Sequence, residues 1–163
     1  MHTTWNRFTY RAAESVTTSA TVQVTLPGGR PHAWLDRRTT GDGRTRWDWR
    51  GGGLGDFSIE VEKPGDSFLL TDPMGIPFGR IRSQGTLLPR LTGGDADAAR
   101  FVIDLDGRIR ACHGLHRGLG RIMVHSPAEL AVDLEVVADE TLATLLAAAP
   151  LCHAATRATP AHA

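Results

Sequence analysis

Hydrophobic and polar residues alternate along most of this chain, and a two-residue period predicts β-strands. The clearest run is residues 22–26 (VQVTL), which the turn-forming triplet Pro27-Gly28-Gly29 ends. Similar runs predict further strands at residues 32–36, 45–49, 57–61, 68–70, 76–81, 101–103, 109–111, 122–124 and 130–136. Residues 92–99 (TGGDADAA) are polar and rich in glycine, so we predict a connecting loop there.

The period changes near the end of the chain, where a helix is predicted. Asp139 is a suitable N-cap, and Glu140 is favoured in a first turn by the helix dipole. Residues 142–149 then place leucine and alanine at helical spacing. Because proline lacks an N–H group, we expect Pro150 to end or kink the helix. Residues 157–163 are small and polar and are predicted to form a frayed tail.

These elements together predict one mostly β domain. Short strands with one apolar face need a closed or sandwiched sheet to bury that face. We therefore expect a single antiparallel β-barrel of about ten strands with one apolar C-terminal helix, over residues 1–156. The helix also needs apolar walls, so it is expected either against or inside the barrel, and the sequence leaves both positions open.

Charge and hydropathy make some partners unlikely on physical grounds. The 163 residues include 18 basic and 18 acidic ones, whereas a protein that coats duplex nucleic acid usually has a basic surface, so no nucleic-acid partner is expected. The longest apolar stretch, residues 142–152, is about half the ~20 residues that span a bilayer, which predicts no membrane span. Residues 1–26 contain no apolar segment typical of a secretory signal. Cys112 and Cys152 are therefore expected as free thiols in a reducing cytoplasm. The oligomeric state is left undetermined.

Three tryptophans form the first candidate site. Trp47 and Trp49 lie on one face of their predicted strand, and Trp34 lies on the facing strand of the same hairpin. On its own strand, Trp34 shares its side with His32 and Asp36. Indoles beside a few polar groups are typical of an apolar small-ligand pocket, and all five residues are candidates for ligand binding. The same indoles also suit the core of a barrel with few other aromatic residues, so both interpretations stay open.

The arginines of the same hairpin suggest a further interpretation. Together with the tryptophans they are similar to a platform for single-stranded nucleic acid. These arginines are Arg37, Arg38, Arg44, Arg46 and Arg50. Three aspartates are interleaved with them, at positions 36, 42 and 48. We therefore favour a solvated, non-binding face.

One sequence cluster has metal-ligand chemistry: Cys112, His113, His116 and His125. A zinc site needs three or four such ligands, usually as two close pairs, and residues 152–153 (Cys-His) are the available second pair. The spacing fits none of the common zinc patterns. We therefore predict no metal and no other cofactor, and expect the domain to fold without metal. His113 and His116 remain candidates for ligand binding or for a general base.

The second half of the chain carries a recognisable order of parts. Residues 101–107 (FVIDLDG) predict a strand and an aspartate–glycine turn, residues 126–132 (SPAELAV) follow, and Asp139 then precedes the apolar helix. Residues 68–82 (FLLTDPMGIPFGRIR) add an earlier hairpin. This order resembles the scramblase and LURP-one-related group, the tubby C-terminal-like family. The resemblance implies an apolar helix threaded through the barrel.

Two departures limit what the resemblance implies. Scramblases carry an Asp-x-Asp-x-Phe-Gly calcium segment before the helix, whereas residues 126–132 offer only Glu129. Their final helix is apolar enough to enter a membrane, whereas the helix predicted here is rich in alanine and interrupted by Pro150. Neither calcium dependence nor lipid scrambling is therefore expected.

Two functions from different classes remain. The first is a binding module that holds or senses an apolar small molecule in a scramblase-like barrel, or docks a partner. The second is a small cofactor-free enzyme of secondary metabolism that orients a polyene or similar apolar substrate for cyclisation or isomerisation. The sequence contains no serine-hydrolase, phosphate-loop or dinucleotide motif, and such an enzyme would need none, so motifs do not separate the two functions. We favour the binding module, because no constellation of acid, base and nucleophile stands out in the sequence. The position of the helix distinguishes the two, since a helix inside the barrel leaves no interior site and a helix outside leaves a cavity.

Overall fold

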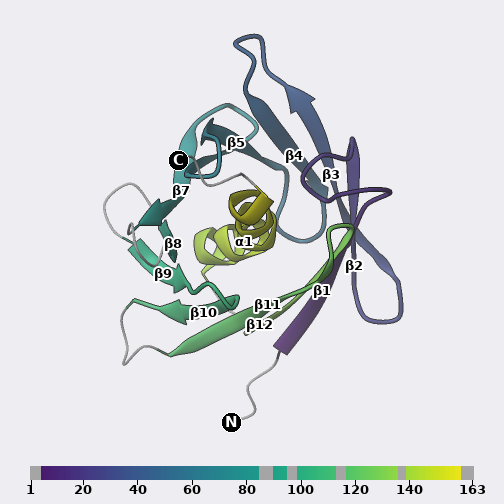
Figure 1. Cartoon of the computed structure of the whole chain (residues 1–163), viewed down its shortest axis with the longest axis vertical. Helices are drawn as coiled ribbons and strands as arrows, with labels where there is room; N and C mark the ends of the chain where they lie inside the picture. Colours follow the sequence, from purple (N-terminus) through teal and green to yellow (C-terminus); the bar gives the residue numbers. More distant parts are fainter. Residues whose placement is uncertain (1–4, 85–89, 95–98, 113–116, 136–138, 159–163) are drawn as a thin grey trace.

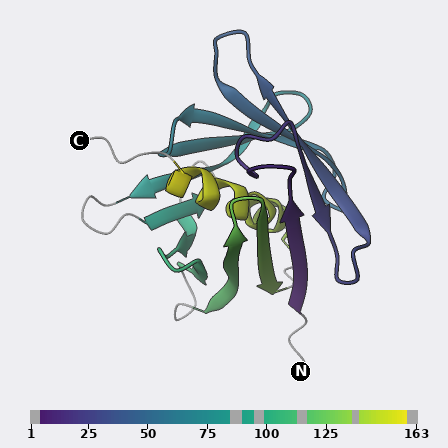
Figure 2. The same cartoon turned by 45° about the vertical axis from the view of Figure 1, so that its right-hand side comes forward.

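The alternating segments form a closed antiparallel β-barrel, and the C-terminal helix runs through its interior (Figures 1 and 2). The computed structural model describes residues 5–84, 90–94, 99–112, 117–135 and 139–158. Its strands are β1 (Trp5–Arg11), β2 (Thr21–Thr25), β3 (Pro31–Thr39), β4 (Thr45–Gly51), β5 (Phe57–Lys63), β6 (Ser67–Thr71), β7 (Pro77–Gln84), β8 (Arg90–Gly94), β9 (Ala99–Ile103), β10 (Arg108–Ala111), β11 (Gly118–Ser126) and β12 (Glu129–Glu135). The helix is α1 (Glu140–Ala158).

Each strand pairs with the strands before and after it in the chain, and the barrel closes where β1 pairs with β12. Closure leaves none of the described strands at a free sheet edge. The inward side chains of the strands form one continuous core with α1. The predicted fold class, an antiparallel barrel with one C-terminal helix, is confirmed.

Two strands were not predicted, β1 and β8, and they raise the strand number above the expected ten. In β1 only two aromatic side chains, Phe8 and Tyr10, mark the inner face, which is too little for a periodic signal. The predicted loop at residues 92–99 was wrong at both ends, because residues 92–94 belong to β8 and Ala99 begins β9. Residues 95–98 lie outside the described residues. A Cβ atom at Gly93 would collide with the ring of Phe101 on β9. Glycine at this position therefore reflects crowding inside the sheet.

Helix α1 is buried around its whole circumference, since residues 144–153 are all buried. The predicted N-cap is confirmed: the Asp139 carboxylate accepts a hydrogen bond from the Leu142 N–H at 3.0 Å. The helix does not end at Pro150 but continues to Ala158, because packing inside the barrel outweighs the loss of one helical hydrogen bond. Residues 159–163 of the predicted tail lie outside the described residues. No helix in the described ranges is both long and apolar enough to cross a bilayer.

The helix packs mainly against β7 and β8. A Cβ atom at Gly79 of β7 would lie 2.7 Å from Cδ2 of Leu145, so the missing side chain allows this close approach. The opposite wall carries bulky rings instead, among them Tyr10, Trp49 and Phe57, and the rings of Trp49 and Phe57 stack at 5.3 Å. Space therefore remains on the aromatic side of the helix, near both of its ends.

Candidate functional site

A β-bulge places His32 at one end of the barrel. The register between β2 and β3 shifts beside His32, which has no partner residue on β2. A bulge of this kind takes its extra residue out of the regular alternation. His32 therefore does not share the outer face with Trp34. Its ring centroid lies 5.0 Å from that of Phe8 and 6.3 Å from that of Trp49.

These rings border an apolar cavity of about 260 Å³ at the end of the barrel where α1 begins. Strands β1, β3, β4 and β12 and the first turns of the helix form its walls. Its lining comprises Asn6, Phe8, Tyr10, His32, Trp49, Gly53, Leu54, Leu134, Glu135, Ala143, Leu146 and Ala147. The volume lies just below the range of roughly 300–1,000 Å³ that is common for small-molecule sites. We call this space the entry cavity.

The helix contributes small side chains to the entry cavity. Ala143 and Ala147 lie one turn apart on the same face of α1, and their methyl groups leave room between helix and wall. The fully buried Tyr10 hydroxyl donates a hydrogen bond to the Ala147 carbonyl at 2.6 Å. Burial raises the pKa of Tyr10, so its phenol stays protonated at neutral pH. Tyr10 thus ties the barrel wall to the helix and fixes the shape of the cavity.

The polar groups of the entry cavity are neutral or already paired. The Trp49 indole N–H donates to the Gly51 carbonyl at 3.0 Å. Glu135 binds Arg117 through both carboxylate oxygens, at 2.5 and 3.0 Å. Burial lowers the pKa of His32 below its ordinary value, so its imidazole is neutral at pH 7. No charged group of the described lining is therefore left without a partner.

The titratable side chains of the lining are those of Tyr10, His32 and Glu135. The described lining includes no serine, threonine, cysteine or lysine that would act as a nucleophile. His32 is the one neutral base at the rim, and its imidazole can donate one hydrogen bond and accept another.

The structure separates the predicted ligand-binding residues into three places. It brings His32 and Trp49 together at the entry cavity. Trp34 points outward from β3 and is 40% exposed. Asp36 lies on the same outer side, where it is ion-paired. Trp47 points inward but borders a different hollow, at the far end of the helix.

The predicted histidine cluster is only partly placed. His113 and His116 lie outside the described residues. Cys112 is half-buried after β10, His125 is exposed on β11, and residues 152–153 are buried on α1. Within the described ranges, no group of three or more histidine, cysteine or acidic side chains is arranged to hold a metal ion.

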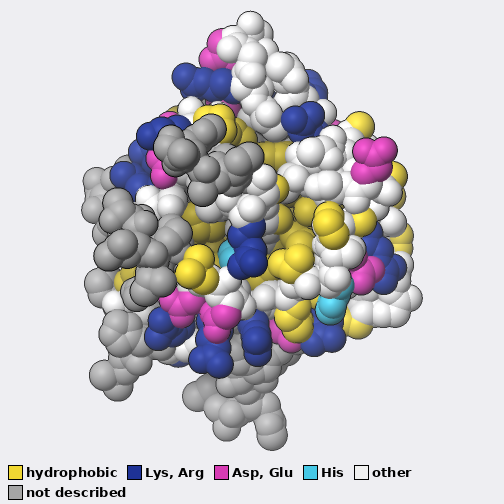
Figure 3. Space-filling model, in the orientation of Figure 1, with side chains coloured by type: hydrophobic (Ala, Val, Ile, Leu, Met, Phe, Trp, Pro, Cys, Tyr) yellow, Lys and Arg dark blue, Asp and Glu magenta, His cyan; other side chains and the backbone are white. Residues whose placement is uncertain are grey.

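Most arginines of the β3–β4 hairpin are neutralised by acidic neighbours, as expected for a solvated face. The ion pairs are Arg38 and Arg46 with Asp48, Arg50 with Asp36, and Arg44 with Asp42. Burial alone would raise the pKa of Asp48, but hydrogen bonds from Ser58 and Arg46 hold it below its ordinary value. In the space-filling view into the ring of strands, apolar side chains show at the centre and most charged ones lie towards the edge (Figure 3). Arg37 is the exception in the hairpin and faces inward.

Several lining residues escaped the sequence analysis. The two-residue spacing of Phe8 and Tyr10 was a usable signal, because it marks one face of a strand. Ala143 and Ala147 gave none, since alanine is common in any helix.

No protein-family model matches this chain, and the search of curated proteins likewise found no match.

Proposed function

We propose that this protein is a binding module that holds an apolar small molecule in the entry cavity. The observation that carries the proposal is the cavity wall, in which the rings of Phe8, Tyr10 and Trp49 enclose about 260 Å³ without an unpaired charge among the described lining residues. Burial of apolar ligand surface in such a space is favourable by about 25 cal/mol per Å². A helix inside the barrel was expected to leave no interior site, but the small residues at its start leave this space.

The chemistry of the walls favours a compact, neutral ligand. A charged ligand would lose its hydration without gaining an opposite charge, because the Glu135 carboxylate is already bound by Arg117. His32 offers one polar contact at the rim, so a ligand with a single hydroxyl or carbonyl group fits as well. Ring-shaped ligands gain from stacking against Trp49 and Phe8.

A neutral fluorescent probe tests this proposal. N-phenyl-1-naphthylamine is uncharged and gains fluorescence in apolar surroundings. We expect saturable binding to the protein, and a loss of roughly tenfold in affinity for Ala143→Phe, because one tenfold step corresponds to about 1.4 kcal/mol. The added ring would fill the entry cavity from a half-buried position of α1.

Thr141→Phe is the matched control, since Thr141 is half-buried in the same helical turn but does not line the cavity. It should bind the probe as the native protein does. Failure of the native protein to bind, or equal losses in both variants, would overturn the proposal.

The position of His32 supports an enzyme as the second candidate function. His32 borders the entry cavity, and burial lowers the pKa of its imidazole, which makes it a neutral base at pH 7. A cofactor-free cyclase or isomerase would use it to accept a proton from one carbon of a bound polyene and to return that proton to another carbon, so that the mass does not change. Incubation with an acyclic polyene, followed by chromatography, would detect a product of unchanged mass, and His32→Gln should abolish that product.

The family resemblance and the location remain proposals as well. A barrel with α1 inside it is the arrangement that the resemblance to the scramblase and LURP-one-related group implies, and it supports membership. The free thiols of Cys112 and Cys152 support a reducing compartment, which we propose to be the cytoplasm.

A further inference from the structure

A second hollow lies at the opposite end of the barrel, where α1 ends, and we call it the exit hollow. Its volume is about 420 Å³. The tip of the β3–β4 hairpin, the turn between β5 and β6 and the last helical residues, including Ala158, surround it. Val61, Phe68 and the ring of Trp47 give it apolar walls.

Two residues that line the exit hollow each have a buried N–H donor without an acceptor in the described part of the chain: Nε of Arg37 and Nε1 of Trp47. The two residues lie directly opposite each other on β3 and β4. Cβ atoms of such a pair are about 4.5–5.5 Å apart. Trp47 is 2% exposed, so its indole N–H has little access to solvent. Buried donors without an acceptor are rare in native proteins and call for a specific explanation.

Arg37 faces inward for a simple reason. Strand β3 alternates, and Arg37 continues the inner side that Ala33 and Leu35 occupy. No ion pair joins its guanidinium to any residue of the described ranges. A guanidinium keeps its charge at any physiological pH, so Arg37 brings to the hollow a positive charge that no described residue pairs with.

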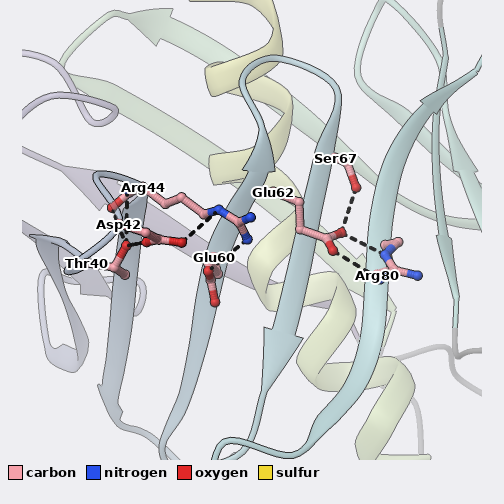
Figure 4. Close-up of polar contacts among 7 residues, drawn as sticks. All are labelled: Thr40, Asp42, Arg44, Glu60, Glu62, Ser67 and Arg80. Carbon is pink, nitrogen blue, oxygen red and sulfur yellow. Dashed lines mark hydrogen bonds and ion pairs between the residues drawn. The ribbon is translucent and has the colours of Figure 1, made fainter.

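The other charged groups of the exit hollow are already paired (Figure 4). Asp42 accepts from Thr40 and forms an ion pair with Arg44 at 3.2 Å. Glu62 accepts from Arg80 at 2.7 and 3.1 Å and from Ser67 at 2.8 Å.

These contacts determine the charge state of both acids. A hydrogen bond from Thr40 holds the pKa of Asp42 below its ordinary value, and one from Arg80 does the same for Glu62. Both carboxylates are therefore ionised at neutral pH, and each is balanced by its own arginine. Neither is available to Arg37.

We propose that the exit hollow is a second binding site, which takes a small carboxylic acid with an apolar body. Its two carboxylate oxygens accept hydrogen bonds from Arg37 and Trp47, and its apolar body lies against Phe68 and Val61. The two donors come from residues directly opposite each other, so each can serve one oxygen of the same carboxylate. A phosphate dianion would meet a single cation, whereas phosphate sites usually gather several. The site is independent of the entry cavity.

The experiment compares 3-phenylpropanoate with the neutral 3-phenylpropanamide. Titration followed by calorimetry and by the indole N–H signals in a ¹H–¹⁵N spectrum should show binding of the acid, with a downfield shift of the Trp47 signal. The amide should bind roughly tenfold more weakly, as expected when a charge-assisted hydrogen bond is lost. Arg37→Gln should lower the affinity for the acid by a similar factor, and Trp47→Phe should lower it by less.

Arg38→Gln is the matched control, because Arg38 is the next residue of the same strand but is ion-paired with Asp48 on the outer side. It should leave the affinity unchanged. Arg37→Gln should keep the native melting temperature, since Arg37 has no ion pair to lose, and unfolding of that variant would contradict this account of the site.

The proposal is overturned by equal binding of acid and amide, by unchanged binding in Arg37→Gln, or by displacement of the acid by equimolar inorganic phosphate. Ala143→Phe, which fills the entry cavity, should bind the acid normally. This variant therefore distinguishes a failure of the exit-hollow proposal from a failure of the entry-cavity proposal, which the neutral probe tests.

Discussion

The two ends of the barrel give the same residue type two different roles. Trp49 at the entry cavity and Trp47 at the exit hollow are two residues apart on β4, face inward and are almost fully buried. The N–H of Trp49 is bonded to the Gly51 carbonyl. The N–H of Trp47 has no acceptor among the described residues. The two indole rings are buried to a similar degree, but only one of them has a partner for its N–H group among the described residues.

Backbone geometry accounts for this difference. Strand β4 ends at Gly51, whose φ of 90° turns the chain so that its carbonyl faces the preceding indole. Trp47 lies mid-strand, where the surrounding backbone groups are used in pairing with β3 and β5. The indole N–H at the entry cavity is therefore bonded, whereas the one at the exit hollow has no acceptor among the described residues. This difference agrees with the ligands proposed above, a neutral molecule for the entry cavity and an acid for the exit hollow.

The largest effect is expected from a charge placed on α1, because this helix forms a wall of both sites. Leu145→Asp and Thr144→Asp each bury an unpaired carboxylate, since the native side chains are 0% and 7% exposed. Such burial costs several kcal/mol against a total stability of about 5–15 kcal/mol. Both variants should lose their folded circular dichroism signal. A folded Thr144→Asp would show that one face of the helix is open.

Acid should destabilise the buried part of the helix near the exit hollow. Burial, followed by the charge of Arg157, lowers the pKa of His153 from 6.5 to about 4, while Asp106 acts in the opposite direction. The folded pKa lies below the unfolded one, so the unfolded state binds the extra proton and stability falls as the pH drops from about 6.5 to 4. With about 1.4 kcal/mol for each unit of difference, we expect a loss of roughly 2 kcal/mol between pH 7 and pH 5.

Urea denaturation at the two pH values measures this loss. His153→Gln removes the titrating group, so its stability should change much less over the same interval. An equally steep decline in this variant would assign the acid sensitivity to other groups. The acids whose pKa is lowered, such as Glu62 and Asp139, lose their contribution only below about pH 5, as the pH falls through their unfolded pKa values of 4.5 and 3.8.

A smaller effect is expected where the helix touches β7. In Gly79→Ala the new methyl group meets Leu145 at 2.7 Å and pushes α1 towards the aromatic wall, which should cost about 1–3 kcal/mol and narrow both sites. Gly41→Ala is the control, because nothing lies within 4 Å of its new methyl group and its φ is not positive. Similar midpoints of denaturation for the two variants would show that the helix is not held against β7.

The fold was largely predictable because alternation and capping are local signals. Strand β5 follows from its alternating Phe57, Ile59 and Val61, and the start of α1 follows from Asp139. The strand β8 was not predictable, because its Gly93 is required by the ring of Phe101, a contact between different strands. Nor was the continuation of the helix through Pro150, since the surrounding barrel stabilises it.

The candidate sites were predictable only in part. The sequence identified His32 and Trp49 but grouped them with Trp34, because a strict alternation carries no sign of the bulge beside His32. It also placed Arg37 with the surface arginines. The inward direction of that residue depends on strand register, and its lack of an acceptor depends on every neighbour in space. Such facts belong to the assembled barrel and leave no local pattern.

The smallest effect compares the two indoles directly, through Trp49→Phe and Trp47→Phe. Both changes remove the same volume from a buried ring, so their packing losses are similar. Trp49→Phe also leaves the Gly51 carbonyl without its donor, which costs about 1 kcal/mol, whereas Trp47→Phe removes a donor that has no partner in the described chain. We therefore expect Trp49→Phe to be the less stable variant by about 1 kcal/mol. Urea denaturation followed by circular dichroism avoids the altered tryptophan fluorescence. Equal stabilities would mean that the Trp47 N–H has an acceptor after all. An excess of 3-phenylpropanoate should reduce the difference in stability between the two variants, because the acid then supplies an acceptor for the Trp47 N–H of the Trp49→Phe variant.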